Sequence, residues 1–147
     1  MDYRQNLIED DAAIGELIRG ARRIAVLGIK TEAQGDQPAY YVPAYLKSVG
    51  VEVIPVPVYY PEVQEILGVP VCRELAEVPG PVDILDVFRR PTDLPKHLED
   101  MKKLSPRAVW FQQGIRNDAV AKELALAGVK VVQDRCLMVE WKRHAGK

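Results

Sequence analysis

The residues best suited to chemistry lie in a short loop that follows an apolar run. Residues 22–31 read Arg-Arg-Ile-Ala-Val-Leu-Gly-Ile-Lys-Thr, so Gly28 and Lys30 come directly after that run. A glycine lets the backbone approach a ligand closely, and a following helix offers free N–H groups to an anion. The dinucleotide fingerprint Gly-x-Gly-x-x-Gly is incomplete, because the next glycine is Gly35. The loop therefore predicts phosphate binding without NAD as the default ligand.

Polar, aromatic and proline residues follow the other apolar runs as well. Arginine offers a planar pair of donors to a phosphate, lysine offers a point charge, and prolines with an aromatic ring form a slot for a flat base. In an open parallel sheet the ligand lies beyond the carboxyl ends of the strands. The pattern therefore predicts a pocket for a phosphorylated nucleotide. The candidate binding residues are Gly28, Ile29, Lys30, Thr31, Pro38, Pro55, Val56, Pro57, Val58, Phe88, Arg89, Arg90, Gln112, Gln113 and Gly114.

The elements that must position these residues alternate between strands and helices. Nearly continuous runs of Val, Ile and Leu are typical of strands buried on both faces, and their spacing fits a strand followed by a crossover helix. We therefore expect a single α/β domain over residues 1–147. Its fold should be a three-layer, Rossmann-like sandwich with a doubly wound parallel sheet of five main strands in the order 3-2-1-4-5. The strands are predicted at residues 24–27, 51–56, 82–87, 108–111 and 129–132.

A proline governs where the helix after the first strand should begin. An apolar stripe at helical spacing leads up to Gly50. Because Pro43 is tolerated only in the first turn of a helix, this helix is predicted to begin near Tyr41 or Val42. Residues 57–80 hold several prolines and indicate a long, less regular connection with short helical or extended pieces. Further helices are predicted at residues 10–19, 119–127 and 136–143.

The composition argues against several classes of protein. The chain has 147 residues and a formal net charge of −1, which is not the basic balance of a nucleic-acid binder. No apolar run reaches the roughly 20 residues needed to cross a bilayer, and the first residues do not resemble a signal peptide, so a cytoplasmic protein is expected. Cys72 and Cys136 lie far apart with no nearby histidine, which argues against a disulfide framework and a metal site.

Few residues are arranged for catalysis, and no catalytic residue is assigned. Asp83 and Asp86 lie three apart in a predicted strand and therefore on opposite faces. His97 falls in the amphipathic stretch 93–104 and is expected on a solvated helix face. Cys136 lies near the predicted N-terminus of the last helix, where a thiolate is favoured. Both a reactive thiol and a packed small residue stay open at that position.

Taken in chain order, these motifs resemble a known family. The segments that carry the resemblance are 24–28 (Ile-Ala-Val-Leu-Gly), 53–56 (Val-Ile-Pro-Val), 82–89 (Val-Asp-Ile-Leu-Asp-Val-Phe-Arg), 110–115 (Trp-Phe-Gln-Gln-Gly-Ile) and 134–136 (Asp-Arg-Cys). They are similar to the small stand-alone CoA-binding proteins, which resemble the N-terminal CoA-binding domain of the succinyl-CoA synthetase alpha subunit. The similarity covers roughly residues 10–143.

The resemblance implies where each part of CoA would lie. Residues 28–31 would approach the diphosphate, residues 55–58 and 88–90 the adenosine end, and residues 112–114 the pantetheine arm. The chain departs from the family's usual residues around the phosphates. Lys30 is expected to replace the contacts that are lost at Gln37, Ala39 and Val58.

The preferred functional hypothesis is non-catalytic binding of CoA or an acyl-CoA at the carboxyl ends of the strands. Two alternatives of other classes are a partner-dependent component of an acyl-CoA ligase or transferase, and an NAD(P)-binding redox sensor. A structural domain that dimerises is a further alternative. The expected partners are a small-molecule CoA ligand and either a second copy of the chain or a ligase subunit, with no nucleic acid and no membrane.

Overall fold

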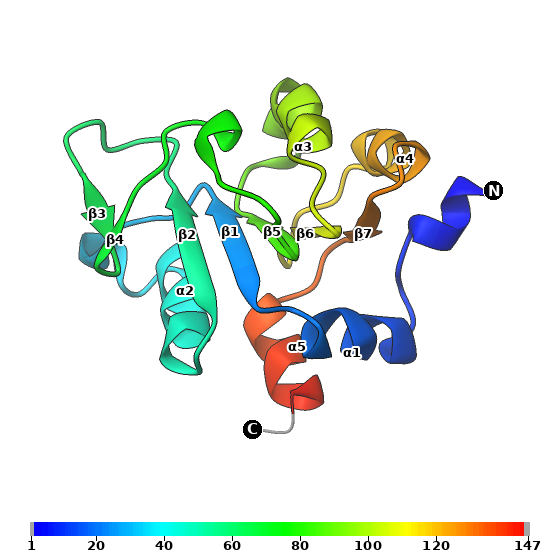
Figure 1. Ribbon diagram of the computed structural model, residues 1–147, viewed down its shortest axis with the longest axis horizontal. Coiled ribbons are helices and arrows are strands. Elements are labelled where there is room, and N and C mark those ends of the chain that lie inside the picture. Colours follow the sequence, from blue (N-terminus) through cyan, green and yellow to red (C-terminus); the bar gives the residue numbers. More distant parts are fainter. Residues whose placement is uncertain (1, 146–147) are drawn as a thin grey trace.

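The structure, a computed structural model, describes residues 2–145, and this part of the chain contains one parallel sheet of five strands (Figure 1). The strands form where the sequence has short runs of apolar residues, and most of their side chains are buried. They agree with the five strands predicted from the sequence. Their bounds are β1 Arg23–Leu27, β2 Glu52–Val56, β5 Ile84–Val87, β6 Ala108–Phe111 and β7 Lys130–Val132.

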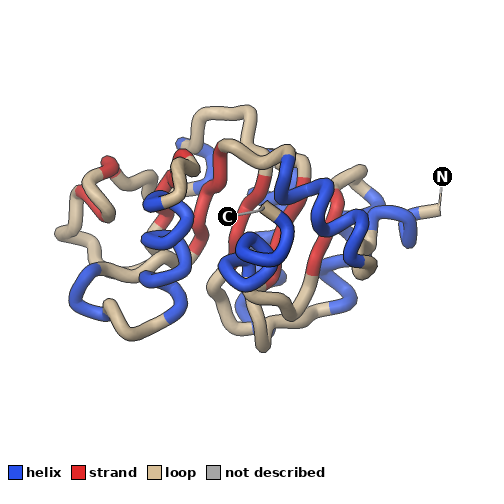
Figure 2. The backbone as a smooth tube through the Cα atoms, turned by 90° about the horizontal axis from the view of Figure 1, so that it is seen from below, coloured by secondary structure: helices blue, strands red, loops and turns tan. Residues whose placement is uncertain are grey.

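Helices cover both faces of this sheet. They are α1 Asp11–Arg19, α2 Pro38–Ser48, α3 Leu98–Leu104, α4 Asp118–Leu126 and α5 Leu137–His144, with short 3-10 segments η1 Tyr3–Asn6, η2 Glu32–Gln34, η3 Leu75–Glu77 and η4 Pro91–His97. In Figure 1, α1, α2 and α5 lie below the sheet and α3 and α4 above it. Figure 2 shows the lower helices in front of the strands. The arrangement confirms the predicted three-layer, Rossmann-like α/β fold.

Two apolar cores hold the layers together. The helices below the sheet pack on Ile24 and Trp110, and the helices above it pack on Leu85 and Phe111. Neighbouring residues of a strand point to opposite faces, so each central strand contributes to both cores. The sheet is thereby fixed from both sides, and the loops at its carboxyl edge start from rigid strand ends.

The predicted strand order 3-2-1-4-5 is wrong, because the strands lie in the order β2-β1-β5-β6-β7, which is 2-1-3-4-5 in chain order. Pro55 explains why the second strand is at the edge. Its carbonyl accepts a hydrogen bond from the Cys72 N–H at 2.9 Å, outside the sheet, so the N–H that proline lacks is not needed for strand pairing. The third strand then pairs with β1, and strand order reverses between β1 and β5.

The helix after β1 begins at Pro38, earlier than the predicted start near Tyr41 or Val42. Pro43 consequently lies inside the helix, where it cannot donate to the carbonyl of Ala39, four residues earlier. The backbone N–H of Lys30 donates to that carbonyl instead, over 3.1 Å. The proline therefore leaves an acceptor free that ties the loop after β1 to the helix.

The connection between β2 and β5 contains a small hairpin. Its strands are β3 Glu65–Ile66 and β4 Val69–Pro70, joined by Leu67 and Gly68, which both have positive φ. Two such residues are the usual basis of a tight two-residue hairpin turn. The rest of the connection is irregular, as predicted.

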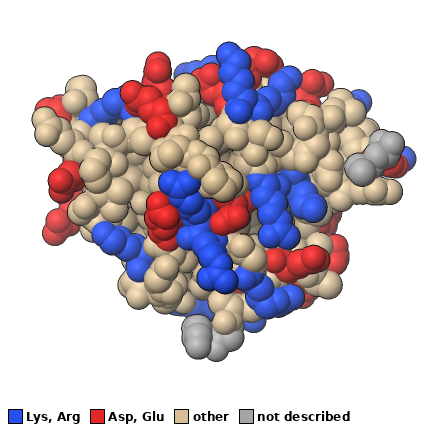
Figure 3. Space-filling model, in the orientation of Figure 1, with Lys and Arg blue, Asp and Glu red and all other residues tan. Residues whose placement is uncertain are grey.

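The prediction of one domain over residues 1–147 stays a prediction, and both of its ends lie outside the described residues. No helix within residues 2–145 is long and apolar enough to cross a membrane. On the face shown in Figure 3, basic and acidic side chains are interspersed, in keeping with the formal net charge of −1.

Candidate ligand-binding site

A cavity of about 460 Å³ lies at the carboxyl edge of the sheet, next to the point where strand order reverses. We call it the strand-tip cavity. Its volume falls within the range of small-molecule sites in proteins, roughly 300–1,000 Å³. Segments that follow β1, β5, β6 and β7 all contribute to its wall. The predicted residues that it brings together are Lys30, Pro38, Phe88, Arg89, Arg90, Gln112, Gln113 and Gly114.

Gly28 permits the close approach of two strand ends beside this cavity. Its φ is +85°, and a Cβ placed on it would lie 2.3 Å from the carbonyl oxygen of Phe88. A side chain is therefore excluded at this position by both the backbone conformation and the space. The N–H of Gly28 donates to the carbonyl of Val56 over 2.9 Å, which extends the β1–β2 pairing into the loop.

Lys30 lies in the wall of the strand-tip cavity. Its backbone is fixed by the hydrogen bond to Ala39, and its ammonium donates a hydrogen bond to the side-chain oxygen of Gln37, another residue of the wall. A lysine held in this way offers further N–H groups to a ligand, because an ammonium has three donors. The side chain therefore supplies a positioned positive charge near the end of β1.

The two consecutive arginines after β5 have different environments. The side chain of Arg89 is 8% exposed and that of Arg90 is 79% exposed, and both pair with Asp93, over 3.4 Å and 3.1 Å respectively. The hydrogen bond from Arg90 is the main reason why the pKa of Asp93 is lowered, and Lys96 contributes in the same direction. Asp93 is therefore ionised and orients both guanidinium groups. Arg90 is the more accessible of the two cations.

Arg89 is also held from two other sides. Its Nε donates to Nε2 of His97 over 3.3 Å, and its guanidinium lies 5.7 Å from the ring centroid of Tyr59. Burial lowers the pKa of His97, and the charges of Arg89 and Lys96 lower it further. The imidazole is therefore neutral and can accept the hydrogen bond. The prediction of His97 on a solvated helix face is wrong, since the ring is half-buried against the cavity wall.

Gln112 joins the end of β6 to the start of α5. The residue is 3% exposed, its backbone N–H donates to Val87 over 3.3 Å, and its Oε1 accepts from the N–H of Leu137 over 2.9 Å. Two residues further on, Gly114 donates its N–H to the side-chain carboxylate of Asp134 over 2.6 Å. These contacts fix the loops after β6 and β7 against each other. Gln113, between the two, is exposed at the mouth of the cavity.

Several predicted residues do not line the strand-tip cavity. Ile29 is 1% exposed and packs in the core, and Thr31 is hydrogen-bonded to Gln34 at the start of η2, facing a different hollow. Pro55 and Val56 are buried within β2. Burial of the side chain in the core is the physical reason why Ile29 and Val56 offer none to a ligand. Gly28 borders the site through its backbone.

Pro57 and Val58 line a neighbouring open cavity of about 560 Å³. Tyr59, Tyr60 and Arg73 contribute to the same wall. Tyr59 of this wall lies against Arg89 of the strand-tip cavity, so the walls of the two cavities are in contact. Of the two segments predicted to bind the adenosine end, residues 88–90 therefore line the strand-tip cavity, whereas Pro57 and Val58 line its neighbour.

Sequence reasoning missed part of the wall. Tyr41 is 40% exposed and lines the cavity because α2 begins at Pro38, so that residue 41 falls in the first turn of the helix at the cavity rim. Pro91 lines it because η4 follows Arg90 without a spacer. Proline favours the first position of a helix, so Pro38 could have been recognised as the helix start in place of Pro43. That start would have predicted Tyr41 in the first turn. The residues not among the candidates are Gln37, Ala39, Tyr41, Pro91, Ile115 and Cys136.

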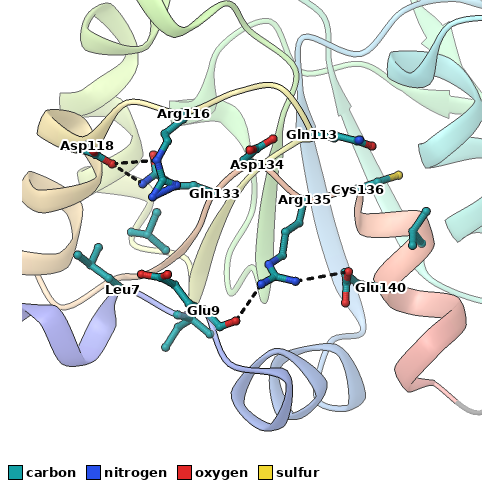
Figure 4. A pocket seen from close by; sticks show the side chains of 13 residues that line it. Leu7, Glu9, Gln113, Arg116, Asp118, Gln133, Asp134, Arg135, Cys136 and Glu140 are labelled. Carbon is teal, nitrogen blue, oxygen red and sulfur yellow. Dashed lines mark hydrogen bonds and ion pairs between the residues drawn. The ribbon is translucent and has the colours of Figure 1, made fainter.

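A second cavity of about 450 Å³ adjoins the first, and we call it the side cavity (Figure 4). Gln113 and Cys136 line both cavities. The charged groups of the side cavity largely pair with one another. Arg135 donates to the carbonyl of Glu9 over 2.9 Å and lies 3.7 Å from Glu140, while Arg116 lies 3.4 Å from Asp118.

The electrostatic character of the strand-tip cavity follows from its lining. Lys30, Arg89 and Arg90 are positively charged, and no acidic side chain is among the described residues that line it. Asp93, behind the wall, neutralises part of this charge. The remainder favours a polyanion, and arginine matches the geometry of phosphate oxygens. Phe88, Pro38 and Tyr41 give the same cavity an apolar part that suits the uncharged portion of a ligand.

Comparison with known families decides what kind of domain this is. A model for the CoA binding domain matches residues 22–142. The chain belongs to the CoA binding domain family. This match confirms the resemblance noted in the strand-tip motifs, and every segment that lines the strand-tip cavity lies within the matched residues.

The chain is also similar to proteins of known sequence or structure. The chain is 34% identical over 128 residues to YneT of Bacillus subtilis, an uncharacterized protein, covering 87% of this chain and 91% of YneT. It is similar to cell-free ID.343 from Thermus thermophilus, with 43% identity, a TM-score of 0.83 and coverage of 92% and 98%. An acetyl-coenzyme A synthetase from Ca. Korarchaeum cryptofilum shares the fold, with 17% identity, a TM-score of 0.66 and coverage of 79% and 26%.

Proposed function

We propose that the protein binds CoA or an acyl-CoA in the strand-tip cavity without catalysing a reaction of it. The observation that carries the proposal is the convergence of Lys30, Arg89 and Arg90 on a cavity without an acidic side chain among its described lining residues. CoA carries a diphosphate and a ribose phosphate, so a site for it needs several cations. Membership of the CoA binding domain family supports this choice of polyanion.

The positions of the side chains suggest how the ligand would lie. Lys30 and Arg90 would face the phosphates, because both offer N–H groups at the end where strand order reverses. The adenosine would extend past Arg89 toward Tyr59 in the neighbouring cavity, where an aromatic ring and Arg73 can stack on a base. The pantetheine arm would run the opposite way, toward Gln112.

The absence of catalysis is proposed from the chemistry of the wall. Cations, amides and apolar side chains bind and orient a ligand, whereas general acid–base catalysis needs a carboxyl or imidazole group within reach of the reacting atom. The described lining residues of the strand-tip cavity include neither. His97 is adjacent but is engaged as an acceptor for Arg89.

A thermal-shift comparison tests the proposal against other nucleotides. CoA and acetyl-CoA should raise the melting temperature more than equal concentrations of ATP or NAD. A ligand present at about 100 times its dissociation constant stabilises a protein by about 2.7 kcal/mol, which is a readily measured shift. The absence of a shift with both CoA compounds, or an equal shift with NAD, would contradict the proposal.

A second candidate is a component of an acyl-CoA ligase that needs a partner chain. The shared fold with an acetyl-coenzyme A synthetase favours it, because the matched region is 26% of that longer chain. In this case the protein would bind the CoA substrate while a partner supplied the catalytic groups. Affinity capture with the tagged protein, followed by an assay for ATP-dependent acyl-CoA formation, distinguishes the two. Retention of a ligase subunit with activity would favour the second candidate.

A further inference from the structure

Cys136 lies where the two adjoining cavities meet. It lines both the strand-tip cavity and the side cavity, and it is the residue that precedes the first turn of α5. In Figure 4 its sulfur lies at the same end of the side cavity as Gln113, the other residue that the two cavities share. The thiol is therefore on the wall of the proposed ligand site.

Gln112 provides a second observation that points to a ligand at this place. The residue is 3% exposed and lines the strand-tip cavity, and its Oε1 is used by the N–H of Leu137, the neighbour of Cys136. Within residues 2–145 its Nε2 donates no hydrogen bond, and it is not among the fully buried polar atoms that lack a partner, so it is accessible at the cavity wall. An accessible amide donor in this position can bind a carbonyl acceptor of a ligand. The pantetheine arm of CoA carries two amide carbonyls.

The position of Cys136 follows from its contacts at the start of α5. After β7 the chain turns back to α5, which packs against α1 and α2, and Cys136 is the residue before the first turn of that helix. The hydrogen bond from the Leu137 N–H to Oε1 of Gln112 over 2.9 Å fixes this segment beside the Gln112 amide. A pantetheine arm with an amide carbonyl on Gln112 would therefore bring the sulfur of CoA close to Cys136.

We propose that Cys136 forms a mixed disulfide with CoA by exchange with CoA disulfide. The inference rests on the proposed CoA site. The Cys136 thiolate attacks one sulfur of the disulfide, so the S–S bond of CoA disulfide breaks and a new bond forms between Cys136 and one CoA. The other CoA leaves as a thiolate and takes up the proton that Cys136 released. The cysteine is thereby oxidised, and half of the CoA disulfide is reduced.

Cys72 offers a matched control within the same chain. It is also a free, partly buried cysteine, but its thiol donates to the backbone carbonyl of Glu77 over 3.8 Å. Burial raises the pKa of the Cys72 thiol, and the charge of Glu77 raises it further. Because the thiolate is the attacking species, Cys72 should react slowly. Its position after β4 is also outside the strand-tip cavity.

Intact-mass spectrometry of the reduced, full-length protein after incubation with CoA disulfide tests the proposal. The wild-type protein and Cys72→Ser should gain the mass of one CoA less two hydrogens, with the bond on the Cys136 peptide, and Cys136→Ser should show no gain. Glutathione disulfide, which lacks the nucleotide, should react with Cys136 at least roughly tenfold more slowly, because it is not held in the cavity. Equal rates for the two disulfides, or modification of Cys72 instead, would overturn the proposal.

The failure of this inference can be separated from the failure of the proposed function. Calorimetric titration of the wild-type protein with reduced CoA in the presence of a reductant measures the site alone. Binding of CoA without any adduct from CoA disulfide would overturn the mixed disulfide and leave the CoA site standing. An absence of binding, together with equal slow reaction of both disulfides, would overturn both.

Discussion

Arg89 donates a hydrogen bond from its Nε to Nε2 of His97 over 3.3 Å, and this contact fixes a cation in the wall of the strand-tip cavity. The acceptor is available only while the imidazole is neutral. Burial, with the charges of Arg89 and Lys96, lowers the pKa of His97 and favours that form. His97 is therefore a positioning residue for the proposed CoA site.

Acidification should destabilise the protein through His97. The pKa of His97 is lower in the folded protein than in the unfolded chain, so the unfolded chain takes up the proton first as the pH falls. The contribution of neutral His97 to the free energy of unfolding is therefore full above pH 6.5, the ordinary pKa, and is lost below it. We expect His97→Asn to lose less stability than wild type between about pH 7.5 and 5.5, by under about 1 kcal/mol for this partly hydrated group. Urea unfolding at the two pH values measures this, and equal losses would contradict it.

Arg90 should contribute more to CoA affinity than to stability. Its side chain is 79% exposed and lines the cavity, so Arg90→Gln should weaken CoA binding by roughly tenfold, about 1.4 kcal/mol, through loss of a charge-assisted contact to phosphate. Arg4→Gln is the matched control, because Arg4 is 74% exposed and pairs with Asp2 in the N-terminal segment. Calorimetric titration of both variants with CoA measures the effect, and equal affinities would argue against a phosphate at Arg90.

Replacing Gly28 should destabilise the junction of β1 and β5. In Gly28→Ala the new Cβ would meet the Phe88 carbonyl at 2.3 Å, in addition to the left-handed backbone, and we expect a loss of more than about 2 kcal/mol. Gly128→Ala is the control, since φ is +88° there with no atom within 4 Å of the added Cβ. It should cost about 1 kcal/mol. If thermal unfolding gave equal losses of stability for the two variants, the close approach of Gly28 to the Phe88 carbonyl would be refuted.

Asp86 should make the protein less stable as the pH rises. It is fully buried in β5, its carboxylate oxygens make no hydrogen bond of normal geometry to a described residue, and burial raises its pKa well above 3.8. The proton bound to the Asp86 carboxyl contributes fully to the free energy of unfolding below pH 3.8, the ordinary pKa. As the pH rises from there to the pKa of Asp86 in the folded protein, this contribution falls by up to about 1.4 kcal/mol per pH unit. Asp86→Asn should therefore exceed wild type in melting temperature by more at about pH 8 than at about pH 5. A difference independent of pH would contradict this.

Much of the fold could be predicted because burial on both faces leaves a clear record in the sequence. The five strands appear as nearly continuous apolar runs, and Lys30, Arg89 and Arg90 come shortly after two of those runs in the chain. The order of the strands in the sheet is less clearly indicated by the sequence. Pro55 was the available signal, since a proline within a strand favours an edge, whereas the order 3-2-1-4-5 would have placed it inside the sheet.

The missed parts of the site depend on contacts between segments. Pro43 appeared to exclude a helix interior, but the Lys30 N–H uses the carbonyl that this proline leaves free, and this long-range contact is not encoded in local pattern. The earlier helix start in turn brings Tyr41 to the cavity. The role of His97 depends in the same way on the path of η4 beside Arg89. Helical periodicity alone favoured a solvated face.

Isothermal titration of the wild-type protein with CoA tests the central proposal most directly. CoA should bind with one molecule per chain and a dissociation constant far below about 1 mM, the level that corresponds to only about 4 kcal/mol. The affinity should fall as salt is added, because the phosphates are held by cations that include the exposed Arg90. No heat of binding for CoA or acetyl-CoA up to millimolar concentrations, or binding unaffected by salt, would contradict a CoA site formed by Lys30, Arg89 and Arg90.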